Sequence, residues 1–171
     1  MKNARFILAA TVAMLVLNLA VWAEEPPGKE RAELAKAVSA AKVSLEKGLV
    51  ASATEGRPIS AKFEMEDGKL QLSVYTMKGD KFYEVVIDHQ TGKAAKTEPI
   101  TEGEDLAAAK SQSEAMAKAR LSLREVVSKA VAEHKGFLAV SVFAGIKDGH
   151  PVADLSLVKG DEWKTVTEEL D

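Results

Sequence analysis

The residues of this chain that could do chemistry are few and widely spaced. The three histidines, His89, His134 and His150, lack the close spacing of two zinc ligands on one helix, and the chain has no cysteine. His134 follows a predicted helix, and the other two lie beside predicted turns. We interpret all three as solvated or helix-capping side chains, so the sequence predicts no metal site.

The carboxylates and serines also lack the patterns of known active sites. Glu64 and Glu66 occupy alternating, solvent-facing positions of a predicted strand, where charges keep a sheet edge soluble. Asp67-Gly68 and Asp148-Gly149 lack the neighbouring acids of a calcium loop and are typical of hairpin turns. The sequence contains no G-x-S-x-G elbow, phosphate-binding glycine loop or dinucleotide fingerprint. It predicts no catalytic residue and no cofactor, and we expect a protein that is not an enzyme.

The composition is that of a folded domain with an acidic balance. Of the 171 residues, 46% are hydrophobic and 29% are charged, which excludes a disordered tail or a disulfide-stapled mini-protein. The formal charge is −3, and loss of Lys2 and Arg5 with a signal peptide leaves 21 basic against 26 acidic residues. Two Trp, two Tyr and five Phe offer few stacking platforms, so nucleic acid is not an expected partner.

The first 23 residues have the pattern of an export signal. Lys2 and Arg5 precede an apolar run, and Val21-Trp22-Ala23 places permissible residues at the −3 and −1 positions of a signal-peptidase site. The alternative is an uncleaved membrane anchor, because residues 6–23 are just long enough to span a bilayer. We predict an exported protein, periplasmic or secreted, with no stable membrane span after cleavage.

The rest of the chain contains an internal repeat. Residues 41–45 match residues 119–123 at an offset of 78. The turn dipeptides recur at an offset of 81, with Asp67-Gly68 and Gly79-Asp80 matching Asp148-Gly149 and Gly160-Asp161. Phe82 and Trp163 are then equivalent, and we interpret both as core aromatics, with partner anchoring as the alternative. The agreement of period and internal spacing indicates a tandem duplication.

Each copy is predicted to begin with a helix. Apolar residues recur every three or four positions over residues 34–49 and again over residues 106–130, which indicates one apolar stripe in each. Ser122 and Glu125 form a capping-box pattern, and Ser44 stands at the same place in the first copy. We therefore expect each helix to break near its serine.

Strands are predicted to follow each helix. Residues 59–66 alternate between apolar and polar, which indicates one buried and one wet face. Two more strands follow between turns, at 69–77 and 81–88, and the second copy repeats the pattern at 138–146, 152–158 and 163–168. The predicted fold is α+β, with two tandem units that each pack a helix on a three- to four-stranded antiparallel sheet. The predicted organisation is a signal peptide at 1–23, a first unit at 24–98, a linker at 99–104 within an acidic stretch at 96–105, and a second unit at 105–171 that is truncated at its last strand.

The first copy resembles the PepSY domain. The resemblance rests on Val43-Ser44-Leu45-Glu46 at a helix start and on residues 82–93, which read Phe-Tyr-Glu-Val-Val-Ile-Asp-His-Gln-Thr-Gly-Lys. It covers residues 43–95 and, more weakly, residues 121–171, where Glu-Trp-Lys-Thr-Val replaces Tyr-Glu-Val and no Thr-Gly-Lys follows. The resemblance implies a non-catalytic exported module of the kind found in protease propeptides and cell-envelope proteins. It implies a regulatory contact with proteases and supplies no catalytic residues.

Two functions from different classes follow from these observations. The first is a protein-binding or regulatory module that contacts an exported protease or another envelope protein, for example by strand addition at an edge left open by the missing last strand. The second is an envelope protein that responds to a small ligand or metal ion in a cleft between two sheets. The sequence leaves open the oligomeric state and whether the two sheets merge.

Overall fold

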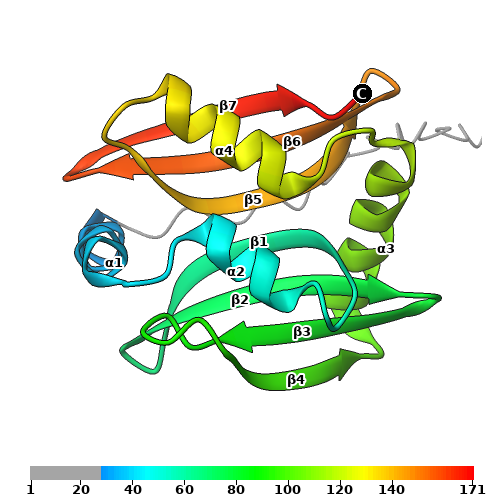
Figure 1. Cartoon of the computed structure of the whole chain (residues 1–171), viewed down its shortest axis with the longest axis horizontal. Coiled ribbons are helices and arrows are strands. Elements are labelled where there is room, and N and C mark those ends of the chain that lie inside the picture. The colour runs from blue at the N-terminus through cyan, green and yellow to red at the C-terminus, as the bar shows by residue number, and fades with distance from the viewer. Residues whose placement is uncertain (1–27) are drawn as a thin grey trace, which may run out of the picture.

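The computed structural model describes residues 28–171, which form an α+β fold with four helices and one seven-stranded antiparallel sheet (Figure 1). The predicted signal peptide at 1–23 lies outside the described residues. None of the helices within 28–171 combines the length and apolar character that crossing a bilayer requires. The elements, in chain order, are α1 (Gly28–Ala40), α2 (Leu45–Ser52), β1 (Arg57–Glu66), β2 (Lys69–Lys78), β3 (Lys81–Ile87), β4 (Ala94–Ile100), α3 (Gly103–Lys118), α4 (Leu123–Glu133), β5 (Leu138–Lys147), β6 (His150–Lys159) and β7 (Glu162–Glu169).

The two copies of the repeat share one sheet, with strand order β4-β3-β2-β1-β5-β6-β7. The copies meet where β1 pairs with β5 through three residue pairs centred on Ala61 and Val142. These two residues differ by the repeat offset of 81, and Ser60 lies opposite Phe143 just as Lys62 lies opposite Ser141. The central ladder is therefore approximately two-fold symmetric about the Ala61–Val142 pair.

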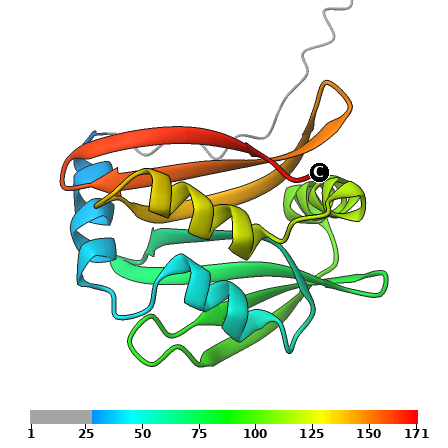
Figure 2. The same cartoon turned by 45° about the horizontal axis from the view of Figure 1, so that its top comes forward.

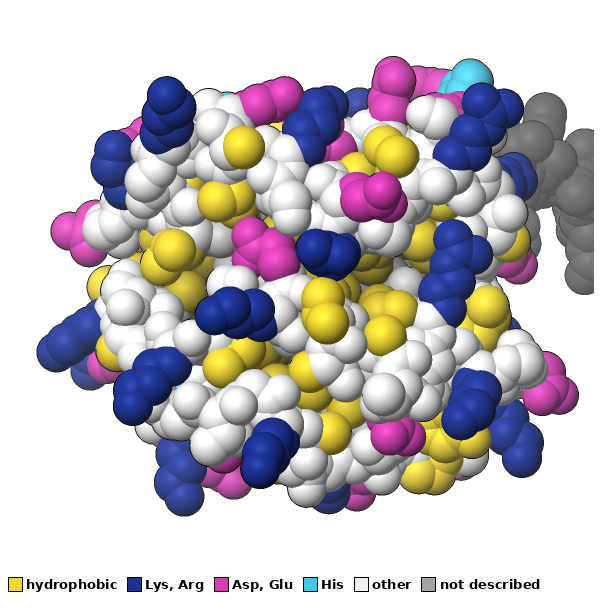
Figure 3. Space-filling model, viewed as in Figure 1, with side chains coloured by type: hydrophobic (Ala, Val, Ile, Leu, Met, Phe, Trp, Pro, Cys, Tyr) yellow, Lys and Arg dark blue, Asp and Glu magenta, His cyan; other side chains and the backbone are white. Residues whose placement is uncertain are grey.

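One face of the sheet is covered by α2 and α4, which lie side by side across it (Figure 1). The predicted alternation of β1 is present, because Ile59, Ala61 and Phe63 are buried against this helix layer. Basic, acidic and apolar side chains all reach the outer surface of the layer (Figure 3). The layer encloses the main hydrophobic core of the molecule.

The predicted helix breaks are confirmed at both serines. Ser44 caps α2 by accepting a hydrogen bond from the Lys47 N–H, and Ser122 caps α4 in a full capping box with Glu125. As a result α1 and α3 are separate helices at opposite ends of the β1–β5 ladder (Figure 2).

The polar face of β1 is less wet than the sequence predicted. Ser60 is 1% exposed, and its hydroxyl donates to Gln112 Oε1 of α3 at 2.7 Å. A strand's alternation pattern cannot show that a helix from the other copy will cover the polar side, so this burial was not predicted.

The loop before each capped helix is held by one carbonyl from the end of a strand. The N–H groups of Lys42 and Val43 donate to the His89 carbonyl at 3.0 and 3.1 Å. At the same place in the second copy, the N–H groups of Arg120 and Leu121 donate to the Leu170 carbonyl at 2.6 and 2.9 Å. The donor residues of the two copies are 78 positions apart, and the acceptor residues are 81 positions apart. Both repeat offsets are therefore present in this pair of equivalent interactions.

The linker between the two units is shorter in the structure than the sequence predicted. Residues 94–100 form the edge strand β4, α3 begins at Gly103, and only Thr101 and Glu102 separate them. The acidic composition of this stretch led to its interpretation as a linker. It contains a strand whose side chains are nearly all exposed. The two Asp-Gly hairpin turns are confirmed, since Asp67, Gly68, Asp148 and Gly149 all have positive φ.

The two copies pack their helices on the sheet with opposite choices of residue size. In the first copy, a Cβ on Gly48 of α2 would lie 2.7 Å from Leu72 Cδ2 of β2. The repeat offsets place Val126 and Ala153 at the corresponding positions of the second copy, and both are fully buried. A small helix residue faces a large strand residue in one copy, and the sizes are exchanged in the other.

This exchange predicts a compensating pair of substitutions. Gly48→Val alone should overpack against the fully buried Leu72 and cost about 1–3 kcal/mol of unfolding free energy, while Leu72→Ala alone should leave a cavity and cost about 2–5 kcal/mol. The double variant Gly48→Val/Leu72→Ala reproduces the residue sizes of the second unit. Its loss of unfolding free energy should therefore be well below the sum of the two single losses. Urea unfolding of all four proteins measures this cycle, and additive losses would show that the two sites do not share one packing volume.

Candidate functional site

The outer side of β7 is an open sheet edge. β7 pairs with β6 on one side, and no strand within residues 28–171 pairs with its other side. β7 runs along one margin of the sheet, and α4 crosses over it on one face of the sheet (Figure 1), where the two elements are in contact. An edge of this kind presents a row of backbone N–H and C=O groups that can pair with another chain.

The direction of each backbone amide in β7 follows from one hydrogen bond and the register. The Leu170 N–H donates to the Pro151 carbonyl at 2.9 Å, and the β6–β7 register continues from there without a shift. In an antiparallel ladder, residues alternate between pairs that exchange hydrogen bonds and pairs that do not. The even-numbered residues of β7 therefore bond to β6. The outward amides belong to Trp163, Thr165, Thr167 and Glu169.

The other edge of the sheet, β4, is a poorer template. Pro99 has no N–H, so β4 lacks one donor near its end. The β3–β4 ladder also has a register shift between Val86 and Ile87. β7 contains no proline and no register shift, and it is the more regular of the two edges.

The side chains of β7 divide between the two faces of the sheet. Lys164, Val166 and Glu168 lie on the α4 face, where Lys129 Nζ of α4 donates to Glu168 Oε2 at 2.6 Å and Lys164 Nζ lies 3.4 Å from His134 Nδ1. On the opposite face the Thr167 hydroxyl donates to Asp154 of β6. The edge thus has an alternating Lys-Val-Glu row on one face and a threonine-rich row on the other.

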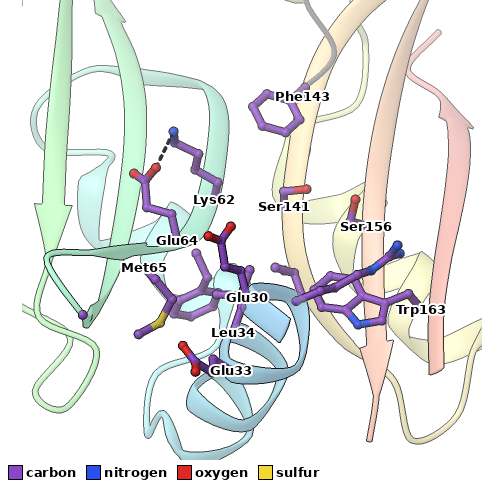
Figure 4. A pocket seen from close by; sticks show the side chains of 14 residues that line it. Glu30, Glu33, Leu34, Lys62, Glu64, Met65, Ser141, Phe143, Ser156 and Trp163 are labelled. Atoms are coloured by element: carbon purple, nitrogen blue, oxygen red, sulfur yellow. Dashed lines mark ion pairs between the residues drawn. The ribbon is translucent and has the colours of Figure 1, made fainter. Parts of the chain in front are cut away.

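A groove of about 510 Å³ lies beside α1, between the ends of β1 and β5 where their short ladder stops (Figure 4). Its walls combine apolar side chains with charged and hydroxyl groups. The lining residues are Glu30, Arg31, Glu33, Leu34, Lys62, Phe63, Glu64, Met65, Gly68, Val140, Ser141, Phe143, Ser156 and Trp163.

Most of the charges in the groove already have partners. Lys62 Nζ and Glu64 Oε2 form an ion pair at 2.6 Å, and the Arg31 guanidinium lies 4.6 Å from the centre of the Trp163 ring. The Glu30 carboxylate has no hydrogen-bond or ion-pair partner within residues 28–171, and it lies between the Lys62–Glu64 pair and Ser141 (Figure 4). The groove can hold a small molecule with an apolar body and one or two polar groups.

The neighbouring polar face carries a tyrosine that stays neutral. Burial of Tyr75 raises its pKa well above the usual range, and the charges of Glu84, Glu64 and Asp105 act in the same direction. Its hydroxyl lies 3.5 Å from Glu84 Oε1. Tyr75 is therefore a protonated donor and not a nucleophile or base.

The three histidines lie on separate elements of the fold. His134 is the C-cap residue of α4, as expected, while His89 contacts Gln90 and His150 pairs with Asp171 at 3.0 Å. Within the described part of the chain, no three His, Asp or Glu residues are grouped closely enough to hold a metal ion.

The prediction that Glu64 and Glu66 both face solvent is wrong for Glu64. Glu66 is exposed, but Glu64 is half-buried, pairs with Lys62 and accepts a hydrogen bond from Ser73 at 3.2 Å. Of the two aromatics, Phe82 is buried in the core, whereas Trp163 is half-buried and lines the groove. The sequence carried no signal for this groove, because α1 and four strands contribute to it only after the two copies have joined.

The His150–Asp171 pair makes a prediction about pH. The Asp171 carboxylate accepts a hydrogen bond from His150. This interaction raises the pKa of His150 above the ordinary 6.5. The stabilisation from this pair is complete below the pKa of unfolded His150 and is lost as the pH rises through the folded pKa. Asp171→Asn should move the His150 pKa back toward 6.5 in an NMR titration. An unchanged midpoint would show that the pair does not form in solution.

Comparisons with known proteins find little similarity. No protein-family model matches the chain, and no curated protein matches it. One solved structure is similar, that of a "putative lipoprotein" from Clostridium difficile 630, with 15% sequence identity and a TM-score of 0.38. The match covers 69% of this chain and 78% of that one. A likeness at this level supports no argument about fold or function, and the resemblance to the PepSY domain stays a prediction.

Proposed function

We propose that this protein is a non-catalytic, exported binding module that accepts an extended segment of a partner protein at the outer edge of β7. The observation that carries the proposal is the set of outward amides at Trp163, Thr165, Thr167 and Glu169. Together with their carbonyls they form an unbroken row, whereas β4 is interrupted by Pro99. Strand addition uses such a row for affinity and the alternating side chains for specificity.

The partner class rests on the sequence. Residues 43–95 resemble the PepSY domain, whose members occur in protease propeptides and cell-envelope proteins. An export signal at residues 1–23 would bring the chain to the same compartment as these proteins. We therefore expect an exported protease or another envelope protein to supply the extended segment, and we expect binding to regulate that partner.

The edge can be blocked without breaking the sheet. Thr165→Pro removes one outward N–H and leaves the hydrogen bonds to β6 intact, so it should abolish capture of the partner with little loss of thermal stability. Thr165→Ala keeps the amide and should bind like the wild type. Val166→Pro removes an inward N–H and should lower the melting temperature, which checks the amide directions.

The measurement is affinity capture from an envelope extract, with wild-type and variant proteins immobilised at equal density. A protein retained by the wild type and by Thr165→Ala, but lost with Thr165→Pro, supports the proposal. Equal retention by all three, or no retention by the wild type in repeated trials, would contradict it.

The groove beside α1 favours a second candidate, a response to a small ligand. It combines a volume of about 510 Å³ and apolar walls with a Glu30 carboxylate that has no partner within residues 28–171. Trp163 lines it and is the only tryptophan within residues 28–171, so its fluorescence reports on the site.

This candidate predicts that apolar amines and related small molecules raise the melting temperature and change the Trp163 emission. Ser156→Phe should fill part of the groove and suppress both effects, while Thr165→Pro should leave them unchanged. A panel of amines, apolar acids and divalent cations in a thermal-shift assay tests the idea. An unchanged melting temperature with every compound of the panel would contradict this candidate function.

A further inference from the structure

We infer that β7 also pairs with β7 of a second copy of this chain, antiparallel and about a two-fold axis at Val166. The inference rests on the same open edge as the proposed function and names a second occupant for it. In the resulting dimer the two seven-stranded sheets continue into one. The interface is isologous, so each copy contributes the same strand.

The backbone geometry fits this register. With Val166 opposite Val166 of the second copy, Thr165 lies opposite Thr167 and Trp163 lies opposite Glu169. All four of these residues have outward amides, so each of these pairs can exchange two backbone hydrogen bonds. Val166 then sits in a pair that exchanges none, where side chains approach most closely.

The side chains on the α4 face fit the same register. Lys164 lies opposite Glu168 of the second copy, and symmetry repeats this pair on the other side of Val166. Glu168 Oε2 is already bonded to Lys129, but Oε1 has no hydrogen-bond partner within residues 28–171 and can accept from the arriving lysine. The row therefore reads Lys-Val-Glu against Glu-Val-Lys, which pairs opposite charges around an apolar centre.

The neighbouring registers that keep outward amides paired are worse. An axis at Thr165 places Glu162 opposite Glu168, and an axis at Lys164 places two lysines opposite each other. An axis at Thr167 leaves Val166 facing Glu168. Only the axis at Val166 satisfies both charges, because like charges directly opposite are destabilising.

The assembly closes at two copies. Pairing uses the β7 edge of each chain, and the margins that remain are both β4, where Pro99 lacks a donor and Lys96 and Glu98 are exposed. The dimer also covers the edge that the proposed partner segment needs. Partner capture should therefore weaken as the protein concentration rises and the dimer fills.

Symmetric cross-linking tests the register directly, since the chain has no cysteine of its own. Val166→Cys places two thiols opposite each other at about 4.5 Å between Cα atoms, within the range for a disulfide. Under mild oxidation it should give a covalent dimer. The matched control Lys164→Cys should not, because its cross-strand neighbour is Glu168 and the two thiols lie far apart.

Sedimentation equilibrium of the unmodified chain gives the second measurement. The wild type should shift from monomer to dimer with concentration, and Lys164→Glu should lose the dimer because it places a carboxylate opposite Glu168. Thr165→Pro should lose both the dimer and capture of the partner segment.

A wild type that stays monomeric, with Val166→Cys and Lys164→Cys cross-linking equally slowly, overturns the inference. That result would leave the proposed function standing if Thr165→Pro still abolished capture. A dimer that forms as described, with no partner captured even at concentrations where the chain is monomeric, would instead contradict the proposed function alone.

Discussion

The whole structure depends on the short ladder between β1 and β5. One helix and three or four strands form a unit of about 50–70 residues, a size at which burial scarcely offsets chain entropy. Pairing β1 with β5 joins the two units into one sheet and places α2 beside α4 over a common core. The ladder has only three residue pairs, and the spaces beyond its ends are occupied by α1 and α3. The central constraint is therefore the burial of two incomplete cores against each other.

The same constraint explains where binding surfaces arise. Once the inner strands β1 and β5 are paired, β4 and β7 must become the two margins of the sheet. β4 carries proline and exposed charges, which are devices against further pairing, whereas β7 keeps all its outward amides. The groove beside α1 has the same origin, because it forms where the short ladder stops and α1 does not fill the remaining space. The β7 edge and the groove beside α1 are thus the places where the joined units leave surface uncovered.

Most local structure could be predicted from the sequence because its causes are local. The Asp-Gly turns, the caps at Ser44 and Ser122, the alternation of β1 and the α+β class each depend on residues close together in the chain. Strand β4 was missed because its exposed, charged sequence carries no apolar pattern. The burial of Ser60 was missed because α3, 52 positions further along the chain, covers it, and the partial burial of Glu64 was missed because it depends on a contact with the neighbouring strand β2.

The sequence alone determined the repeat, its two offsets and the scarcity of groups that could do chemistry, because spacing and residue type need no coordinates. Only the tertiary structure decided that the copies share one sheet, which strands become its margins and which amides of β7 point outward. Strand order depends on pairing between residues some 80 positions apart, and amide direction in β7 depends on the register of β6 against β7. Neither quantity is encoded in the side-chain pattern of a single strand, since the backbone groups that form the edge are the same for every residue except proline.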